Sequence, residues 1–182
     1  MPTRRHFIST ATAATLVARA DAKPGQKLRV GVMGLSRGKA HINNFAQLGG
    51  VEIAYVCNVD QNRLAAGAKF ATERQNGKSP KAVTDFRRIL EDKDVDILSI
   101  AAPNFWHAPA TILACEAGKH VYVEKPGSHN AREAELMVAA AQRTTRKVQM
   151  GNQRRSAPGF REGIEKLKAG VIGELRYARC WY

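Results

Sequence analysis

The segment His120-Val-Tyr-Val-Glu-Lys-Pro126 decides the fold class, because an apolar, β-branched run ends here on a carboxylate, an ammonium and a proline. Such a run is typical of a buried strand in a parallel sheet. Doubly wound α/β sheets bind ligands beyond the carboxyl ends of their strands, so Lys125 is predicted to lie at a binding crevice. A lysine fixed there is suited to protonate, deprotonate or hydrogen-bond a substrate oxygen. The alternative for Glu124 and Lys125 is an ordinary solvated pair where a strand becomes a loop.

Strand-like and helix-like patterns alternate along the rest of the chain. Strands are predicted at residues 28–33, 51–57, 82–83, 96–101, 121–124 and 148–150, and helices at 39–48, 61–74, 86–91, 109–118, 131–144 and 159–168. This alternation predicts an α/β fold with a Rossmann-type doubly wound parallel sheet. Residues 174–182 have a further strand pattern with no successor to pair with, so we expect the start of a truncated second α+β domain.

The N-terminus has the pattern of an export signal. Arg4-Arg5 precede a weakly apolar stretch that ends on Ala18-Arg19-Ala20, which predicts a twin-arginine signal at residues 1–20 and a periplasmic or otherwise exported protein. An N-terminal helix with two chance arginines is the alternative. The segment is too short and too polar for stable membrane insertion. We then expect a linker at 21–27, a dinucleotide-binding domain at 28–155, and a connecting helix and first strand of a truncated domain at 156–182.

Charge and cysteine content restrict the classes of partner. The 29 Lys and Arg residues outnumber the 16 Asp and Glu residues, giving a net charge of +13, but they form no run longer than a pair and are not interleaved with stacking aromatics. We therefore expect no nucleic-acid partner. The cysteines form no CxxC pair and have no histidine at ligand spacing, so no metal site is expected. Cys57 and Cys115 lie in apolar patterns and are predicted to be buried, reduced thiols.

A glycine-rich turn, Gly31-Val-Met-Gly-Leu-Ser-Arg-Gly-Lys-Ala-His41, joins the first strand to the first helix. Turns of this kind bind the pyrophosphate of a dinucleotide, whose charge is held by free N–H groups at the helix N-terminus. Gly34 fits the first glycine of that fingerprint, while Ser36 stands where the second is expected. We expect Gly34, Leu35, Ser36 and Arg37 to contact a cofactor.

The second strand ends at Asn58, where a carboxylate normally accepts the ribose hydroxyls of an adenosine. Asp60 follows two residues later. An amide still hydrogen-bonds a ribose hydroxyl but does not repel a 2′-phosphate, so the cofactor is NAD or NADP. Arg63 could reach such a phosphate, although a solvated helix arginine is the better interpretation of that residue.

The fourth strand runs into Ala102-Pro103-Asn104, and His107 follows one turn later. Proline and asparagine at a strand end are typical of a turn that lines a crevice, so these three residues are predicted to contact the cofactor. His107 could reach the cofactor or the substrate, and a structural histidine with satisfied hydrogen bonds fits the spacing equally well.

With these residues at successive strand ends, the chain resembles the Gfo/Idh/MocA oxidoreductases from Leu28 to Tyr182, and most of all exported members of the glucose-fructose oxidoreductase type. The resemblance implies that Lys125 hydrogen-bonds the reacting hydroxyl and that Glu124 lies against the cofactor. It also implies that the segment Gly151-Asn-Gln153-Arg154-Arg155 lines the crevice near the nicotinamide. Ser36 and Asn58 depart from the family pattern, and both bear on cofactor affinity and choice.

The resemblance also implies an activity. The full protein would transfer a hydride between a nicotinamide and a sugar or cyclitol, and would form a homo-oligomer. Its second domain would supply a catalytic histidine and most of the sugar-binding groups. Two alternatives stay open: an NAD-dependent glycosidase, as some exported relatives are, which oxidises a sugar transiently, and a truncated module that binds a nucleotide without catalysis.

Overall fold

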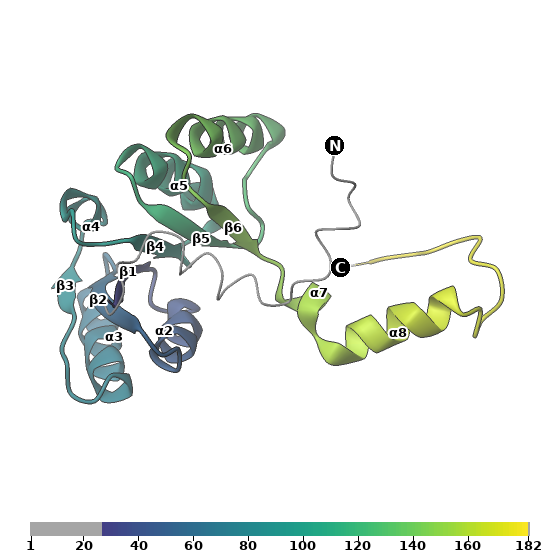
Figure 1. Ribbon diagram of the computed structural model, residues 1–182, viewed down its shortest axis with the longest axis horizontal. Helices are drawn as coiled ribbons and strands as arrows, with labels where there is room; N and C mark the ends of the chain where they lie inside the picture. Colours follow the sequence, from purple (N-terminus) through teal and green to yellow (C-terminus); the bar gives the residue numbers. More distant parts are fainter. Residues whose placement is uncertain (1–26, 182) are drawn as a thin grey trace. The chain divides into compact units, whose positions relative to one another are not determined.

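Six parallel strands form one sheet in the computed structural model, which describes residues 27–181. The spatial order is β3-β2-β1-β4-β5-β6, which is the Rossmann-type order that the alternating pattern predicts. Figure 1 shows this sheet with helices above and below it. The strands are β1 (Leu28–Met33), β2 (Val51–Cys57), β3 (Lys81–Val83), β4 (Ile97–Ile100), β5 (His120–Glu124) and β6 (Val148–Gly151).

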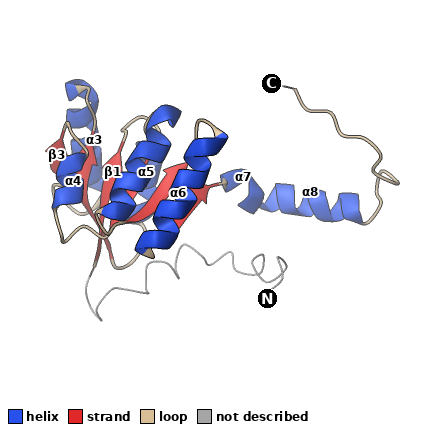
Figure 2. Ribbon diagram, turned by 90° about the horizontal axis from the view of Figure 1, so that it is seen from above, coloured by secondary structure: helices blue, strands red, loops and turns tan. Residues whose placement is uncertain are grey.

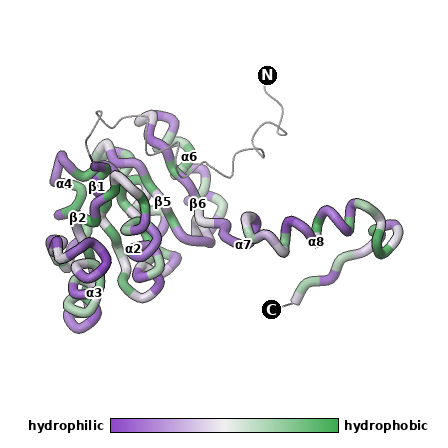
Figure 3. The backbone as a smooth tube through the Cα atoms, turned by 60° about the horizontal axis from the view of Figure 1, so that its bottom comes forward, coloured by the Kyte–Doolittle hydropathy of each residue, from purple (hydrophilic) through white to green (hydrophobic). Residues whose placement is uncertain are grey.

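Helices cover both faces of the sheet and seal its two apolar surfaces. One buried cluster joins the strands to α2 (Gly38–Ala46) and α3 (Gln61–Arg74). The other joins them to α4 (Arg87–Glu91), α5 (His107–Glu116) and α6 (Ala131–Thr144), which lie together on one side in Figure 2. Figure 3 shows the hydrophobic strands between helices of mixed character. Burial on both faces is what turns these strands into near-continuous apolar runs.

Side-chain caps begin two of the long helices. Asp60 Oδ1 accepts the main-chain amides of Asn62 and Arg63 at 2.9 and 3.0 Å at the start of α3. Asn130 Oδ1 accepts the Glu133 amide at 2.9 Å at the start of α6, while the Glu133 carboxylate reaches back to a preceding amide. Asn130 is therefore the N-cap of α6.

The helix start predicted at Pro109 is wrong by two residues. The sheet leaves β4 through a 3-10 turn, η2 (Asn104–Trp106), and α5 begins directly after it at His107. Pro109 is the third residue of α5, where its missing N–H costs no hydrogen bond within the helix. Gly118 has a φ of +77° just beyond the end of α5, as a terminating glycine should.

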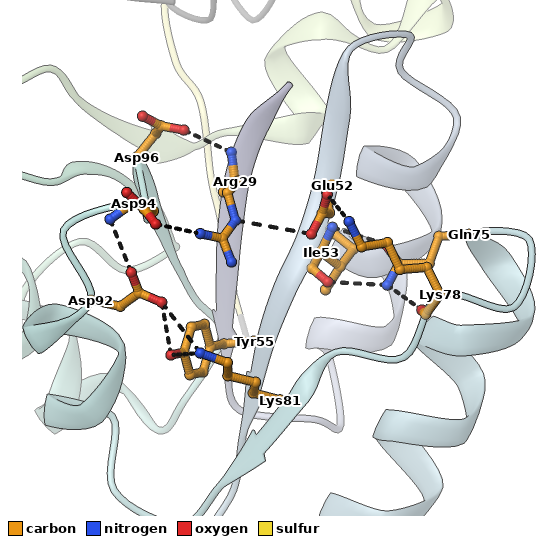
Figure 4. A network of polar contacts seen from close by, with 10 residues as sticks. All are labelled: Arg29, Glu52, Ile53, Tyr55, Gln75, Lys78, Lys81, Asp92, Asp94 and Asp96. Atoms are coloured by element: carbon orange, nitrogen blue, oxygen red, sulfur yellow. Dashed lines mark hydrogen bonds and ion pairs between the residues drawn. The ribbon is translucent and has the colours of Figure 1, made fainter. Parts of the chain in front are cut away.

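Charged side chains near the starts of the strands bind one another (Figure 4). Arg29 in β1 lies between Glu52 of β2, at 3.9 Å, and Asp94, at 3.4 Å, while its main-chain amide donates to Asp96 Oδ2 at 2.7 Å. The Glu52 carboxylate also accepts Lys78 Nζ at 2.5 Å. These contacts connect β1, β2 and the turn before β4 at the amino end of the sheet.

A second part of this network centres on the buried hydroxyl of Tyr55. The hydroxyl donates to Asp92 Oδ2 at 2.9 Å and accepts Lys81 Nζ at 3.1 Å. Lys119, directly before β5, is 4% exposed, and its Nζ donates to the main-chain carbonyl of Asp92 at 2.7 Å. Burial lowers the pKa of Lys119, against the opposing effect of nearby aspartates. The acidic turn after α4 is thus linked to three strands.

Residues 152–181 form a separate unit with α7 (Gln153–Ser156) and α8 (Pro158–Lys168). The sheet-bearing unit ends at Gly151 rather than at the predicted boundary of 155. Green and purple alternate along α8 in Figure 3, and Phe160 and Ile164 are exposed on it. The strand predicted at 174–182 is wrong, because residues 174–181 have no strand structure. A strand needs a neighbour for its ladder of hydrogen bonds, and no described strand pairs with this segment.

The signal predicted at residues 1–20 and all but the last residue of the predicted linker at 21–27 lie outside the described residues. Within residues 27–181, no helix is long and apolar enough to cross a membrane.

Candidate functional site

The carboxyl ends of the central strands are level with one another. Met33, the last residue of β1, lies opposite Cys57 of β2 and Ile100 of β4, and Ile100 lies opposite Val123 of β5. The chain runs outward in opposite directions from β1 and β4, so this edge contains the point where the strand order reverses. Ligands of open α/β sheets bind at such a point. The turns after β1, β2, β4 and β5 all meet there.

The turn after β1 has the geometry of a phosphate cradle. Gly34 has a φ of +88°, and a Cβ placed on it would lie 2.5 Å from the carbonyl oxygen of Ala101 at the end of β4. A Cβ on Gly38 would lie 3.0 Å from Val32 Cγ1, so this glycine allows α2 to pack closely on β1. These are the roles of the first and third glycines of a dinucleotide fingerprint. Only glycine fits the conformation and the space at Gly34.

The N-terminus of α2 opens into this turn without a side-chain cap. Its N-cap residue, Arg37, makes no side-chain capping hydrogen bond to the amides of the first turn. Ser36 and Arg37 are exposed. Leu35 is 2% exposed and packs towards Gly67, where a Cβ would lie 2.6 Å from Leu35 Cδ1. Of the predicted contacts here, Leu35 can therefore offer only its main chain.

The end of β2 carries an amide rather than a free carboxylate. Asn58 Oδ1 accepts the Asp60 amide at 2.9 Å, and this contact does not involve the Nδ2 donor of Asn58. Asp60 is committed to the cap of α3, and its Oδ2 also lies 3.6 Å from Arg63 Nε. Asn58 is thus the polar side chain nearest the strand end. The sequence could have revealed the role of Asp60, because an aspartate directly before a helix is a frequent N-cap.

The turn after β4 presents its residues to solvent. Ala102 is half-buried, while Pro103 and Asn104 are exposed. Phe105 and Trp106 follow in η2 with 56% and 42% of their surface exposed, and Trp106 packs edge-on against Phe86 at 6.0 Å between ring centroids. The predicted crevice turn therefore has two aromatic side chains at its rim.

His107 connects two of these turns. The ring is 2% exposed, with Nδ1 2.6 Å from the carbonyl oxygen of Pro126 and Nε2 2.8 Å from that of Ala102. Both ring nitrogens are thus used within the protein. This geometry favours the structural interpretation that the sequence left open, because His107 holds the turn after β5 against the turn after β4.

Glu124 and Lys125 lie side by side in the sequence but in different surroundings. Glu124, the last residue of β5, is 4% exposed, whereas Lys125 is exposed. Glu124 Oε2 accepts the main-chain amide of Lys125 at 3.3 Å, and the Lys125-Pro126 peptide bond is cis. The two residues are therefore not an ordinary solvated pair. One is a buried carboxylate, and the other places its ammonium on the surface of the crevice edge.

Two further residues, His41 and Ser99, support Glu124 and were not predicted from the sequence. His41 in α2 is 5% exposed, with Nε2 3.0 Å from Glu124 Oε1 and Nδ1 2.8 Å from Oγ of the fully buried Ser99 in β4. Arg37 Nε lies 3.6 Å from the same Glu124 oxygen. The available signal was a histidine within the glycine-rich segment and a serine inside an apolar strand.

The negative charge of Glu124 affects the pKa of Tyr122, which lies two residues earlier in β5. Burial raises the pKa of Tyr122, the negative charge of Glu124 raises it further, and the positive charge of Arg37 opposes both effects. The ring of Tyr122 packs edge-on against His41 at 5.3 Å between centroids. A charged cluster with one aromatic wall thus lies at the end of β5.

Gln153 and Arg154 follow β6 in α7 and belong to the unit formed by residues 152–181. The guanidinium carbon of Arg154 lies 5.6 Å from the ring centroid of Phe160 within that unit. Contact of these two residues with a cofactor stays a prediction.

These features fit a dinucleotide. The glycine cradle, the uncapped helix N-terminus and the amide at the end of β2 occupy the positions that bind the pyrophosphate and ribose in this strand order. In the part of the chain from residue 27 to 181, no group of three His, Cys, Asp or Glu side chains could hold a metal ion.

Residues 28–152 match the family described as "Oxidoreductase family, NAD-binding Rossmann fold", GFO_IDH_MocA. The chain belongs to this family. Its curated relatives include glycosyl hydrolase family 109 proteins of Shewanella pealeana, 31% identical, and Shewanella woodyi, 32% identical, each over 85% of this chain. The match covers 35% and 34% of those proteins, so the chain spans about a third of their length.

Solved structures of the family share the fold. The 3-ketoreductase KijD10 from Actinomadura kijaniata, in complex with NADP, matches with a TM-score of 0.71 and 29% identity over 83% of this chain and 47% of its own. A scyllo-inositol dehydrogenase from Lactobacillus casei, with bound NAD(H) and scyllo-inositol, matches with a TM-score of 0.69 and 26% identity over 82% of this chain and 43% of its own. The predicted family and the predicted NAD or NADP cofactor are confirmed.

Proposed function

We propose that this chain is the cofactor-binding half of an NAD(P)-dependent oxidoreductase that transfers a hydride between a nicotinamide and a hydroxyl-bearing carbon of a sugar or cyclitol. One observation carries the proposal. The glycine cradle at Gly34 and the exposed ammonium of Lys125 lie at the same edge of one sheet, on the two sides of the point where the strand order reverses. This shared edge would bring a bound cofactor close to a proton-donating side chain.

The residues of the cradle would bind and orient the cofactor. The main-chain amides at the start of α2 would donate to the pyrophosphate, with the hydroxyl of Ser36 beside them. The amide of Asn58 would donate to a ribose hydroxyl at the end of β2. The turn at Ala102, Pro103 and Asn104 would line the path between the two ends of the cofactor.

Lys125 would act on the substrate oxygen. The bound nicotinamide supplies hydride transfer, while the protein supplies position and charge. Lys125 Nζ would hydrogen-bond the reacting hydroxyl and stabilise the negative charge that develops on its oxygen. Its side chain is exposed in this chain, so a bound substrate would have to exclude the water around it.

The names of the solved relatives support the substrate class. One is a 3-ketoreductase solved with a TDP ligand, and another is an inositol dehydrogenase solved with its cyclitol. Both names describe oxidation or reduction at a carbon that bears oxygen, which is the class proposed here.

Titration with NADH and NADPH, followed by nicotinamide fluorescence, tests the cofactor half of the proposal. We expect saturable binding, tightened by Ser36→Gly, which restores the fingerprint glycine and so relieves the close approach of the pyrophosphate. Lys125→Ala should leave this binding unchanged, because Lys125 acts on the substrate. Absence of binding by both the natural chain and Ser36→Gly would contradict the proposal.

A second candidate is a glycosidase that uses the same cofactor site, supported by the glycosyl hydrolase family 109 relatives at 31–32% identity. The two reactions differ in whether the nicotinamide cofactor undergoes a net change in oxidation state. A glycosidase of this type would release free sugar from an aryl glycoside without a net change in nicotinamide absorbance, because the transient oxidation is reversed. An oxidoreductase would change the absorbance in proportion to product formed.

We also propose export by the twin-arginine route, on the basis of Arg4-Arg5 and Ala18-Arg19-Ala20. Replacing both arginines by lysine should retain the protein in the cytoplasmic fraction, as read by immunoblotting. An unchanged distribution between fractions would contradict this route.

A further inference from the structure

A buried polar chain runs beneath the candidate site from β4 to the turn after β5. It passes from Ser99 through His41 to the Glu124 carboxylate and on to the main-chain amide of Lys125. We propose that His41, held by Ser99, is a positioning residue that fixes the Glu124 carboxylate and, through it, the main chain that carries Lys125. The importance of this role for cofactor binding rests on the proposed function.

The chemistry of the partners sets the direction of each hydrogen bond. A carboxylate only accepts, so His41 Nε2 donates to Glu124 Oε1 across 3.0 Å. In a neutral imidazole with its N–H on Nε2, Nδ1 accepts the hydroxyl proton of Ser99 across 2.8 Å. Every group in this chain has a partner that suits it. The hydroxyl of Ser99 is compatible with the form of the ring that donates to Glu124.

The two carboxylate oxygens of Glu124 accept hydrogen bonds from different elements of the fold. Oε1 accepts from His41 on α2, and Oε2 accepts the Lys125 amide at 3.3 Å. The carboxylate therefore connects the helix that begins at the glycine cradle to the turn that holds Lys125. A shift of either would be transmitted to the other through one buried side chain.

Arg37 explains why Glu124 needs a second partner. Its Nε lies 3.6 Å from Glu124 Oε1, and 62% of its side chain is exposed. The exposed guanidinium attracts that oxygen towards the surface, and the contact with His41 opposes this pull. With His41 in place, Glu124 stays at 4% exposure, and the donors of Arg37 can turn towards a phosphate.

Two substitutions of similar size separate positioning from packing. The side-chain amide of His41→Gln can reach the place of Nε2 and keep a donor to Glu124. The shorter amide of His41→Asn reaches only the place of Nδ1, so it keeps a partner for Ser99 and removes the hydrogen bond from position 41 to Glu124. Both variants lose the aromatic contact with Tyr122, so a merely structural role would affect them equally.

The first measurement needs no ligand. In amide NMR spectra of the full chain, His41→Asn should shift the resonance of Lys125, whereas His41→Gln should leave it near its natural position. Long-range spectra of the natural ring should show the proton on Nε2. His120→Gln is the matched control, because His120 is similarly buried (7% exposed) at the opposite end of β5 and accepts the Lys147 amide. It should leave the Lys125 resonance unchanged.

The second measurement is a double-mutant cycle on NADH affinity. His41→Asn should weaken binding about tenfold, the loss expected for one hydrogen bond to a charged group. The same substitution should have no effect in a Glu124→Gln background, since His41 acts through Glu124. An additive effect in that background, or equal shifts of the Lys125 resonance in His41→Gln and His41→Asn, would overturn the inference.

The two proposals fail in different ways. A chain that binds neither NADH nor NADPH contradicts the proposed function, while the Lys125 resonance still decides the role of His41. A chain that binds NADH but shows no difference between His41→Gln and His41→Asn retains its function and loses the positioning role.

Discussion

Two lysines flank the same strand, β5, in opposite surroundings. Lys119 precedes the strand, is 4% exposed and donates to a main-chain carbonyl at the amino end of the sheet. Lys125 follows the strand, is exposed, and stands at the carboxyl end beside the buried Glu124. The ammonium of Lys119 is hydrogen-bonded within the protein, whereas the side chain of Lys125 is accessible to solvent. The two residues are of the same type, so the end of the strand at which each lies decides which of them is buried and which is exposed.

The two ends of the sheet show the same contrast: polar groups are paired within the protein at one end and are exposed at the other. At the amino end, Arg29, Tyr55 and their acidic partners bind one another and connect the strands. At the carboxyl end, Gly34 forms a tight cradle and α2 begins without a side-chain cap from its N-cap residue. We therefore expect substitutions at the amino end to lower stability alone, and substitutions at the carboxyl end to change ligand affinity.

The largest effect is expected from Gly34→Ala. The new Cβ would lie 2.5 Å from the Ala101 carbonyl oxygen and would require a φ of +88°, so we expect a loss of about 3 kcal/mol in the free energy of unfolding. Dinucleotide binding should be lost as well. Urea denaturation and NADH titration measure the two effects.

Gly118→Ala is the control for backbone conformation. Gly118 has a φ of +77°, but a Cβ there would meet nothing within 4 Å, so only the conformational cost of about 1 kcal/mol is expected. NADH affinity should not change. Equal losses in the free energy of unfolding for Gly34→Ala and Gly118→Ala would mean that the close approach to Ala101 does not contribute to the cost.

The next effect tests the amino end. Tyr55→Phe removes the hydroxyl that donates to Asp92 at 2.9 Å, and we expect a loss of about 1–2 kcal/mol with NADH affinity unchanged. Tyr177→Phe is the control, because that side chain is 78% exposed. A change in NADH affinity for Tyr55→Phe would contradict the expectation that substitutions at the amino end of the sheet affect stability alone.

A smaller effect concerns the pH dependence of stability. Burial acts to raise the pKa of Asp92, but hydrogen bonds from the Asp94 amide and Tyr55, with the charges of Arg29 and Lys81, outweigh it and hold the pKa below its usual 3.8. A carboxyl whose pKa is lower in the folded state stabilises the protein above its unfolded pKa, and this contribution is lost as the pH falls through the folded pKa. Asp92→Asn should therefore cost less stability at pH 3 than at pH 7. Denaturation at both pH values measures the difference, and an equal cost would contradict it.

The smallest effect concerns the reactivity of the three cysteine thiols. Burial, with the charge of Asp85 second, raises the pKa of Cys57 to about 12, and burial also raises the pKa of Cys115. Neither thiolate forms at neutral pH, whereas Cys180 is exposed. In the native chain at pH 8, an aromatic disulfide reagent should therefore modify Cys180 first, and Cys180→Ser should remove that fast phase. A fast phase that survives the substitution would show that burial does not protect Cys57 or Cys115 from the reagent.

Local patterns in the sequence predicted most of the fold. β1, β2, α3 and α6 have the predicted bounds, because each is set by neighbouring residues: an apolar run, or a helix that begins after Asp60 or Asn130. The predicted burial of Cys57 and Cys115 is confirmed for the same reason. The strand predicted at 174–182 failed because a strand depends on a partner as well as on its own residues.

The site was predictable only in part, for a related reason. The positions of Gly34, Asn58 and Lys125 follow from where strands end, and strand ends are legible in the sequence. The contact of His41 with Glu124 joins residues 83 positions apart, and its contact with Ser99 spans 58. No local pattern encodes such pairs, so the support beneath the site became visible only when the strands were placed side by side.

The uncapped start of α2 has a thermodynamic consequence. A helix whose first amides lack a side-chain partner gains from any anion that takes that place, so a bound dinucleotide would serve as the missing N-cap. Ligand occupancy and folding are then linked, and a ligand at a hundred times its dissociation constant would add about 2.7 kcal/mol to the free energy of unfolding. A thermal melt would consequently report cofactor preference by itself, with the melting temperature climbing further for whichever of NADH and NADPH the chain binds more tightly.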